Sequence, residues 1–407
     1  MTPPLYIALR FLGHRKRAFF LSLGGVVFGV GIFICTQAQT QGFAKNFIDS
    51  TLGSNGALAM KGRVQTLENV SDLPVHPPHR RFFQGIDDAV QIMRVSRQFS
   101  NVVACSPVLR GNLTVRAGFQ SATVDLFGID FPLHLQTTNL AKQIEVGSLE
   151  DFRNNPNSVI LGAKLANALL VGPGDSVQLL SPGGEYRRFV VAATARSGVG
   201  VIDSARIYCH AKVAQTLLRK PYSTSMIIYK LRDPDRAPAL AARFESLFGH
   251  EMESWQDREE GNLQLFLTIR LSAAITVSLI ILLAGFGIFN VLTMSVLSKV
   301  KEIAILRSIG YRRRDISAIF LWQGAMIAGA GSLVGCVAGA LLTWGIAQIP
   351  IRVRGLIFAN HFLVAWDWRH YLWGVLLALV AVAIASYVPA RRAGLLSPVA
   401  TLRGTSG

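Results

Sequence analysis

Four long apolar runs constrain this chain more than any other feature of its sequence. They occupy Ala18–Ala38, Leu271–Leu297, Ile316–Ile349 and Tyr371–Pro389. A helix needs about 20 mostly apolar residues to cross the hydrocarbon core of a bilayer, so each run predicts a membrane-spanning helix. The basic start of the first run is typical of a signal peptide, but Cys35 and the residues after it lack an A-x-A-like cleavage site. We therefore expect the first span to be retained.

The stretch between the first and second runs has the composition of a globular domain. Residues 39–262 hold 24 Lys/Arg and 21 of the chain's 24 Asp/Glu, whereas the remainder carries 17 Lys/Arg against three acids. Short β-branched segments between Gly, Pro and Asn predict strands, and the fold class is therefore an α-helical membrane protein with four transmembrane helices plus a large mixed α/β domain inserted between helices 1 and 2. The predicted strands are 102–109, 113–117, 122–126, 176–180, 188–193 and 226–231, and the predicted helices are 163–170, 212–218 and 237–248.

Basic residues at the ends of the spans predict their orientation. Short loops rich in Lys and Arg stay in the cytoplasm, which places both termini inside and the large domain outside. The excess positive charge therefore indicates anionic lipid headgroups as partners, and we expect no nucleic-acid binding. The loop 350–370 also carries arginines and is the exception. The predicted organisation is a cytoplasmic segment at 1–17, a span at 18–38, an outer domain at 39–262, a stalk and span at 263–298, a cytoplasmic helix at 299–315, a span at 316–349, an outer loop at 350–370, a span at 371–390 and a cytoplasmic tail at 391–407.

The sequence lacks the motifs that bind nucleotides or perform common hydrolytic chemistry. It contains no G-x-x-x-x-G-K-[ST], H-E-x-x-H, G-x-S-x-G or C-x-x-C. The spans hold essentially no ionisable residues and so provide no proton relay. We expect a non-catalytic chain that binds no metal or cofactor. His76 and His79 are expected to be solvated loop residues, and Cys105 and Cys209 either pair in an oxidising compartment or remain core residues.

Glycines recur at helical spacing in two spans. Gly25 and Gly29 form G-x-x-x-G in the first span, and Gly331, Gly335 and Gly339 form a tandem version in the third. Such stripes let helix backbones approach closely. They predict packing either within the chain or between two chains.

The segment Lys299–Asp315 is short, basic and amphipathic. Glu302 near its start and Arg307 one turn later suit the two poles of a helix dipole, and Gly310 is typical of a helix end. A helix of this kind lies on the membrane surface or docks into a cleft of a soluble partner. We expect its apolar residues to gather on one side: Ile303, Ile305, Leu306 and Ile309.

Three segments together resemble one family of membrane proteins. Lys301–Gly310 resembles the segment after the second span of FtsX/MacB-like ABC transporter permeases, also called type VII. Val388–Arg403 is similar to their closing motif, and Ile7–Arg10 to their opening. The layout of one span, a large domain and three spans also matches, so the resemblance covers the whole chain. Within the family, segments such as Val102–Leu109 and Val159–Ala166 look most like the lipoprotein-releasing LolC/LolE type.

The resemblance implies a MacB-like periplasmic core domain and a location in the bacterial inner membrane. It also implies a separate cytoplasmic ABC ATPase dimer that holds ATP and Mg, a second permease chain, identical or different, and a periplasmic lipoprotein chaperone. Mechanotransmission from the ATPase would release lipoproteins toward the outer membrane. The alternatives are a MacB-like efflux permease for peptides or small amphiphiles, an FtsX-like regulator of periplasmic enzymes, and a membrane-anchored sensor without an ATPase. The implied ATPase-coupling helix comprises Lys301, Glu302, Ile303, Ala304, Ile305, Leu306, Arg307, Ile309 and Gly310.

Overall fold

The computed structural model describes residues 16–62, 64–66, 81–83, 85–220, 224–350 and 361–395. His76, His79, Ile7–Arg10 and the end of the closing motif lie outside the described residues. The chain divides into two compact units, which are described separately. Unit 1 comprises 1–45, 264–351 and 361–407, and unit 2 comprises 46–263 and 352–360.

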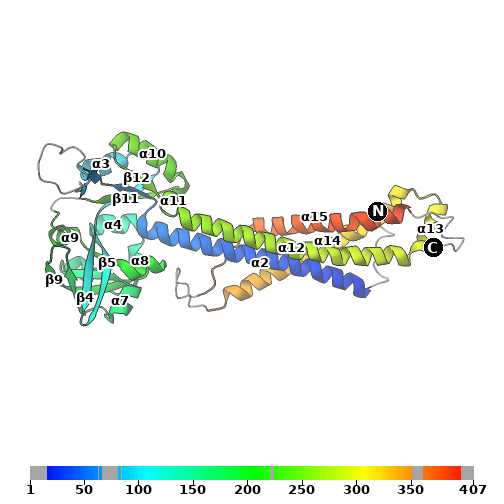
Figure 1. Ribbon diagram of the computed structural model, residues 1–407, viewed down its shortest axis with the longest axis horizontal. Coiled ribbons are helices and arrows are strands. Elements are labelled where there is room, and N and C mark those ends of the chain that lie inside the picture. Colours follow the sequence, from blue (N-terminus) through cyan, green and yellow to red (C-terminus); the bar gives the residue numbers. More distant parts are fainter. Residues whose placement is uncertain are drawn as a thin grey trace, which may run out of the picture. The chain divides into compact units, whose positions relative to one another are not determined.

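The described residues of unit 1 form four long helices and one short one (Figure 1). The long helices are α2 (Lys16–Asn55), α12 (Glu260–Ser298), α14 (Arg313–Ala347) and α15 (Trp368–Leu395). Each is long and apolar enough to cross a membrane, which confirms the four expected spans. The first and second long helices also contribute residues to unit 2. The short helix is α13 (Val300–Ser308).

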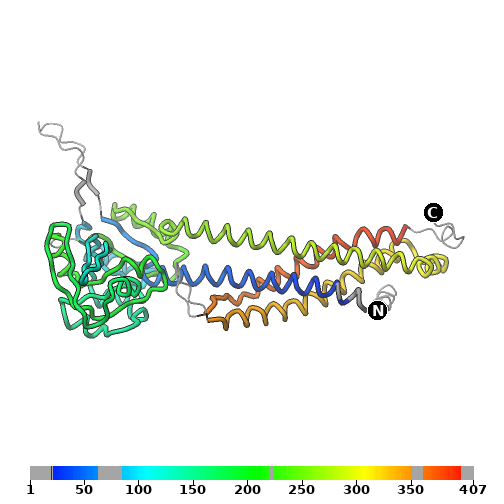
Figure 2. The backbone as a smooth tube through the Cα atoms, turned by 60° about the horizontal axis from the view of Figure 1, so that its bottom comes forward, coloured from blue at the N-terminus to red at the C-terminus, as the bar shows by residue number. Residues whose placement is uncertain are grey.

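The first helix is the most enclosed member of this bundle. Half of its most apolar window is buried, against 22% for the corresponding window of α15. The bundle core combines side chains from all four long helices, which run alongside one another in Figure 2. Outward positions such as Leu283, Leu333 and Ile384 are about 70% exposed, as expected for helices whose solvent is lipid. The core residues are Val26, Val30, Ile34, Ile288, Leu292, Ile327, Ala328, Ala378 and Val382.

Unit 2 is organised around a mixed sheet with the order β12-β1-β11-β4-β5-β10-β7-β9-β6, and β8 pairs with β4 and β9. β2 and β3 form a separate pair. The long strand β4 pairs with β11 through its first half and with β5 through its second, so it belongs to both halves of the domain. The strands are β1 (Leu58–Lys61), β2 (Val64–Thr66), β3 (Arg81–Phe83), β4 (Val102–Ala117), β5 (Gln120–Ile129), β6 (Ile144–Gly147), β7 (Ser158–Gly162), β8 (Ser176–Leu180), β9 (Tyr186–Ala195), β10 (Arg206–His210), β11 (Met226–Leu231) and β12 (Met252–Ser254).

Short helices cover both faces of this sheet. α7 and α9 contribute to the cluster around Leu126 and Ile207, whereas α4, α5 and α6 pack with the cluster around Phe127 and Tyr208. Successive strand residues point to opposite faces, which explains this division. A third cluster joins α3 and α10 to Tyr229. The helices are α3 (Ala89–Ser96), α4 (Phe131–Thr137), α5 (Leu140–Gln143), α6 (Leu149–Asn154), α7 (Ala163–Leu169), α8 (Gly200–Ala205), α9 (Ala211–Leu217), α10 (Ala237–Phe248), α11 (Trp255–Arg258) and the 3-10 turn Pro234–Arg236.

The mixed α/β prediction for this region is confirmed. Every predicted strand lies within an observed one, and the two predicted at 102–109 and 113–117 are parts of the single strand β4. Cys105 and Cys209 are both buried and free. They lie on β4 and β10, with β5 between, and strands are about 4.8 Å apart. That separation exceeds the reach of a disulfide, so the two behave as core residues.

Candidate functional sites

The glycines of the first span lie against the second span. A Cβ atom on Gly29 would lie 2.8 Å from Cγ1 of Ile281, and one on Gly25 would lie 3.3 Å from Cβ of Ala284. Real Cβ atoms essentially never approach within 3.0 Å, so a side chain at position 29 cannot fit without movement of α12. The absence of a side chain therefore sets the distance between these two helices.

The tandem glycines of α14 pack against α2. Cβ atoms on Gly331 and Gly335 would lie 2.8 and 2.9 Å from the Cβ atoms of Val26 and Val30. Gly339 makes the same approach to α2 one turn further along. The two stripes thus pack on α2 and α12 of the same chain. Helix α2 therefore contacts both α12 and α14 at glycine positions.

The short helix α13 is attached to unit 1 through one of its sides. Ile303 and Ala304 are 1% and 3% exposed, and Ile303 packs with residues of α14 and α15. Leu306 is half-buried against the same cluster, and Arg307 donates a hydrogen bond to the carbonyl of Gly394. These contacts hold the helix on the ends of the neighbouring spans.

The prediction that the apolar residues of α13 share one side is wrong. Ile305 is 50% exposed and Ile309 is 72% exposed, whereas Ile303 is buried. Lys301 and Glu302 are also exposed. One apolar side packs on the bundle, and a second surface combines two isoleucines with charge. Gly310, with φ of 111°, ends the segment because L residues rarely adopt that conformation.

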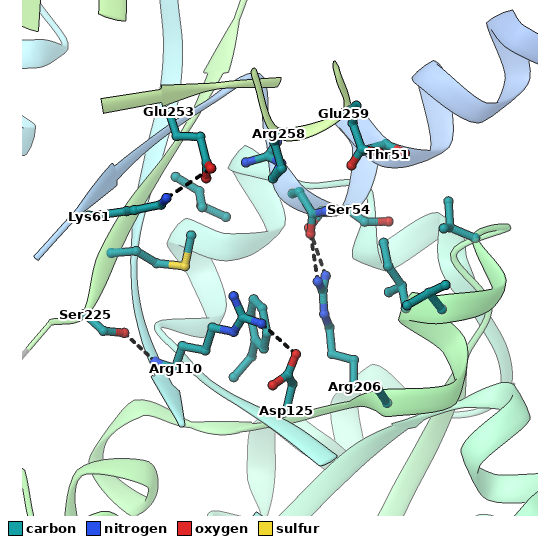
Figure 3. Close-up of a pocket in the computed structure, with 18 of the residues that line it drawn as sticks. Thr51, Ser54, Lys61, Arg110, Asp125, Arg206, Ser225, Glu253, Arg258 and Glu259 are labelled. Atoms are coloured by element: carbon teal, nitrogen blue, oxygen red, sulfur yellow. Dashed lines mark hydrogen bonds and ion pairs between the residues drawn. The ribbon is translucent and has the colours of Figure 1, made fainter. Parts of the chain in front are cut away.

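A cavity of about 800 Å³ lies within unit 2, and Figure 3 shows its charged lining. Its floor is one face of the sheet, where β4, β5 and β10 run side by side. Arg110, Phe127 and Tyr208 form one row across these strands, and Asn112, Asp125 and Arg206 form the next. The register therefore places cations beside an aromatic ring, although the two arginines are almost 100 residues apart in sequence.

Two of the cavity's arginines are held at the carboxyl end of α2. Arg206, 8% exposed, donates Nη2 to Oδ1 of Asn55 at 2.8 Å, and its Cζ lies 4.0 Å from the centroid of Phe127. Arg258 donates Nη2 to the carbonyl of Gly56 at 2.9 Å. Burial, and also the nearby charge of Arg206, lower the pKa of Arg258 even though acidic neighbours oppose the shift. In the described part of the chain, neither guanidinium forms an ion pair with a carboxylate.

Five other charged side chains of the cavity form ion pairs. Nζ of Lys61 lies 3.0 Å from Glu253 and 3.3 Å from Glu251, and Nη2 of Arg110 lies 2.8 Å from Asp125. The side chains of Lys61 and Glu251 are 40% and 68% exposed. Glu251 thus lies toward solvent, whereas the side chains of Glu253 and Asp125 are only 26% and 27% exposed.

Helix α8 supplies an apolar wall of the cavity with Val201 and Ile202. Asp203 fixes the turn before it, because its Oδ1 accepts hydrogen bonds from both N and Oγ of Ser197 at 2.7 Å. Gly198 has a φ of 89°, and a Cβ there would lie 2.9 Å from Oγ of Ser50 on α2. This close approach places the wall beside the end of α2.

Comparison with known proteins identifies the family. Residues 19–247 match the MacB-like periplasmic core domain, and residues 274–398 match the FtsX-like permease C-terminal family. The chain therefore belongs to the FtsX-like permeases with a MacB-like periplasmic core domain. These are ABC transporter permeases of type VII, so the family resemblance is confirmed.

Individual relatives align over most or all of the chain. It is 24% identical to the lipoprotein-releasing system transmembrane protein LolC of Neisseria meningitidis, over 98% of each protein. It is 26% identical to LolC of Xylella fastidiosa, over 99% of this chain and 100% of that protein. It is also 23% identical to the macrolide export ATP-binding/permease protein MacB of Acinetobacter baylyi, over 96% of this chain and 57% of that protein.

Proposed function

We propose that this chain is the membrane subunit of an ATP-driven transporter that releases lipoproteins from the bacterial inner membrane toward the outer membrane. The observation that carries the proposal is the end-to-end alignment with LolC, a lipoprotein-releasing protein, in two organisms. The alignment with MacB, a macrolide exporter, leaves 43% of that relative uncovered. The chain thus matches LolC as a whole protein but matches only part of MacB, whose name includes an ATP-binding function, and the proposal follows LolC.

In this proposal α13 is the site where ATP hydrolysis on another chain acts on the permease. The sequence has no phosphate-binding loop, so ATP and Mg belong to a separate cytoplasmic ATPase dimer. The exposed side of α13 supplies Ile305 and Ile309 for a hydrophobic groove, with Lys301 and Glu302 beside them. An amphipathic helix with spaced apolar anchors is a common way to dock into such a groove.

Helices α2 and α12 are the proposed route from the ATPase to the outer domain. Both contribute residues to unit 1 and to unit 2, so movement of the bundle has a continuous path into the sheet domain. The glycine contacts between them make the pair a closely packed element. Two permease chains and a periplasmic chaperone for the released lipoprotein complete the proposed assembly.

The proposed topology places the sheet domain in the periplasm, between the first and second spans, with both termini in the cytoplasm. Gly183 lies in an exposed turn of unit 2 and provides a test. A Gly183→Cys variant should react with an impermeant thiol reagent in intact spheroplasts, because the native cysteines of unit 2 are buried. Protection until the spheroplasts are lysed would contradict the orientation.

Purification of the intact complex from its native membrane tests the proposed cargo. We expect a triacylated lipoprotein, an ATPase and a second permease chain to travel with this protein, and the lipoprotein to be lost after ATP is added. Recovery of a peptide or a small amphiphile with a periplasmic adaptor, in place of a lipoprotein, would favour the efflux alternative and contradict lipoprotein release.

A further inference from the structure

The cavity of unit 2 combines a buried arginine, Arg206, with an apolar wall, and the proposed lipoprotein release assigns it no role. All of its lining residues belong to unit 2. Its volume of about 800 Å³ lies within the range of small-molecule sites, which is about 300–1,000 Å³. An inorganic phosphate would fill only a small part of it, since one water molecule occupies about 30 Å³.

The positive charge at the buried end is only partly balanced by the protein. Arg206 bonds to Asn55 and Arg258 bonds to the carbonyl of Gly56, both at the carboxyl end of α2. A helix end of this kind carries about half a negative charge. Glu253 and Glu259 also line the cavity and act on Arg258. Arg206 is therefore the buried cation that has no carboxylate partner among the described residues. Leaving such charge buried without a partner costs free energy, so an anion that reached it would be bound favourably.

We infer that the cavity binds a small amphiphile with a phosphate headgroup. The phosphate meets Arg206, because guanidinium groups bind phosphate oxygens through several parallel hydrogen bonds. The apolar part lies against Val201 and Ile202 of α8. Glu251, whose side chain is 68% exposed, repels anions at the rim, so the bound group must reach Arg206 in the interior.

Octyl phosphate is a suitable probe, because it carries one phosphate and one short apolar chain. Titration calorimetry of the full chain in an uncharged detergent should show saturable binding. Arg206→Gln should weaken binding about tenfold to 100-fold, the value of one hydrogen bond to a charged group. Arg206→Lys keeps the charge but loses the parallel hydrogen bonds, so its affinity should lie between those of the wild type and Arg206→Gln. Arg187→Gln removes the same charge from an exposed position outside the cavity and should leave binding unchanged.

A second variant separates ligand binding from the support that Arg206 gives to α2. Val201 is 70% exposed and lines the cavity, so Val201→Glu adds a negative charge without disturbing the core. It should also weaken octyl phosphate binding at least about tenfold by charge repulsion, which a merely structural role for Arg206 does not predict. The thermal unfolding midpoint verifies that each variant folds.

Three outcomes would overturn the inference. Equal binding by the wild type, Arg206→Gln and Val201→Glu would show that octyl phosphate binds elsewhere. If uncharged 1-octanol bound as tightly as octyl phosphate, the phosphate would not contribute to binding. If inorganic phosphate displaced octyl phosphate at an equal concentration, the apolar wall would not contribute to binding. The cavity would then be a site for free phosphate. The experiment does not involve the ATPase or a lipoprotein, so its result is independent of the proposed transport function.

Discussion

The two units of this protein bury their side chains in different ways. In unit 1, the closest contacts between helices are made by glycines against alanine, valine and isoleucine, so that a Cβ on Gly331 would lie only 2.8 Å from Val26. In unit 2, large side chains such as Tyr229, Phe189 and Phe244 fill the interior. Lipid is as apolar as a leucine side chain, so helices in a membrane gain stability from close packing rather than from removing apolar surface from water. The difference shows which solvent each unit folds in.

Charge follows the same division. Unit 2 contains ion pairs such as Arg110–Asp125 and Arg219–Glu185, together with buried arginines. The outward surface of unit 1 is apolar, and its pair Lys299–Glu302 is at α13, outside the long helices. Polar groups are therefore expected to control ligand binding and pH dependence in unit 2. The close packing of side chains is expected to control how the helices of unit 1 assemble.

The largest effect is expected from filling the glycine stripe. Gly331→Leu should lower the free energy of unfolding by about 1–3 kcal/mol, because overpacking forces α14 away from α2. Thermal unfolding in detergent measures the loss. Gly329 lies in the same helix and has no described atom within 4 Å of its Cβ position. Gly329→Leu should therefore unfold close to the wild type, and equal loss in both variants would contradict the packing role of the stripe.

The next effect concerns the pH dependence of unit 2. His134 is 1% exposed, and neither ring nitrogen has a hydrogen-bond partner among the described residues. Burial, and then the charge of Arg206, lower the pKa of His134 from 6.5 to about 3. Between about pH 3 and pH 6.5, His134 binds a proton in the unfolded chain but not in the folded chain. Stability is therefore fully present above pH 6.5 and is lost as the pH falls, by about 1.4 kcal/mol per unit.

A histidine variant tests that assignment. His134→Leu should remove the part of the acid sensitivity that lies between pH 6.5 and 5.5, as measured by chemical unfolding at both values. The pKa of Asp203 is raised mainly by burial, which gives the opposite slope, but that contribution is present in both proteins. An unchanged pH dependence in His134→Leu would show that another group is responsible.

A smaller effect is expected at the helix that presents Arg258. Oγ of Ser254 accepts a hydrogen bond from N of Asp257, whose carboxylate accepts one from N of Ser254. This reciprocal cap begins α11. Ser254→Ala should cost about 0.5–2 kcal/mol of unfolding free energy, as measured by chemical denaturation. A cost no greater than that of an exposed substitution such as Ser246→Ala would contradict it.

The smallest effect is expected at the surface of unit 2. Arg219 lies 2.9 Å from Glu185, and its side chain is 66% exposed. Exposed ion pairs contribute about 0–1 kcal/mol, so Arg219→Gln should leave the unfolding midpoint almost unchanged. A loss comparable to that of Gly331→Leu would show that polar contacts and packing are not divided between the units as described.

Much of the fold could be predicted from the sequence, because its elements are local patterns. The four spans follow from apolar runs, and Met226–Leu231 and Ser176–Leu180 match β11 and β8 residue for residue. Strand β7 was missed because Ser158–Gly162 is a short run buried on both faces, without alternation. The joining of two predicted strands into β4 depends on partners on both sides and has no local pattern.

The sites were less predictable than the fold. The helical period identified α13 as amphipathic but could not show that Ile303 packs inward while Ile305 remains exposed, since that depends on the ends of neighbouring spans. The cavity was not predicted at all. Arg110 and Arg206 come from β4 and β10, which the sheet register brings together, and Arg258 comes from α11 and bonds to Gly56.

The central proposal is that the outward side of α13 binds an ATPase, and co-purification of that ATPase tests it most directly. Ile305→Glu with Ile309→Glu changes exposed residues and should leave the bundle folded and inserted. Leu247→Glu places the same charge on an exposed leucine of unit 2 and is the control. We predict that the double variant loses ATPase at least about tenfold, equivalent to about 1.4 kcal/mol, while Leu247→Glu retains it. Equal ATPase recovery with the double variant and the wild type would contradict the account.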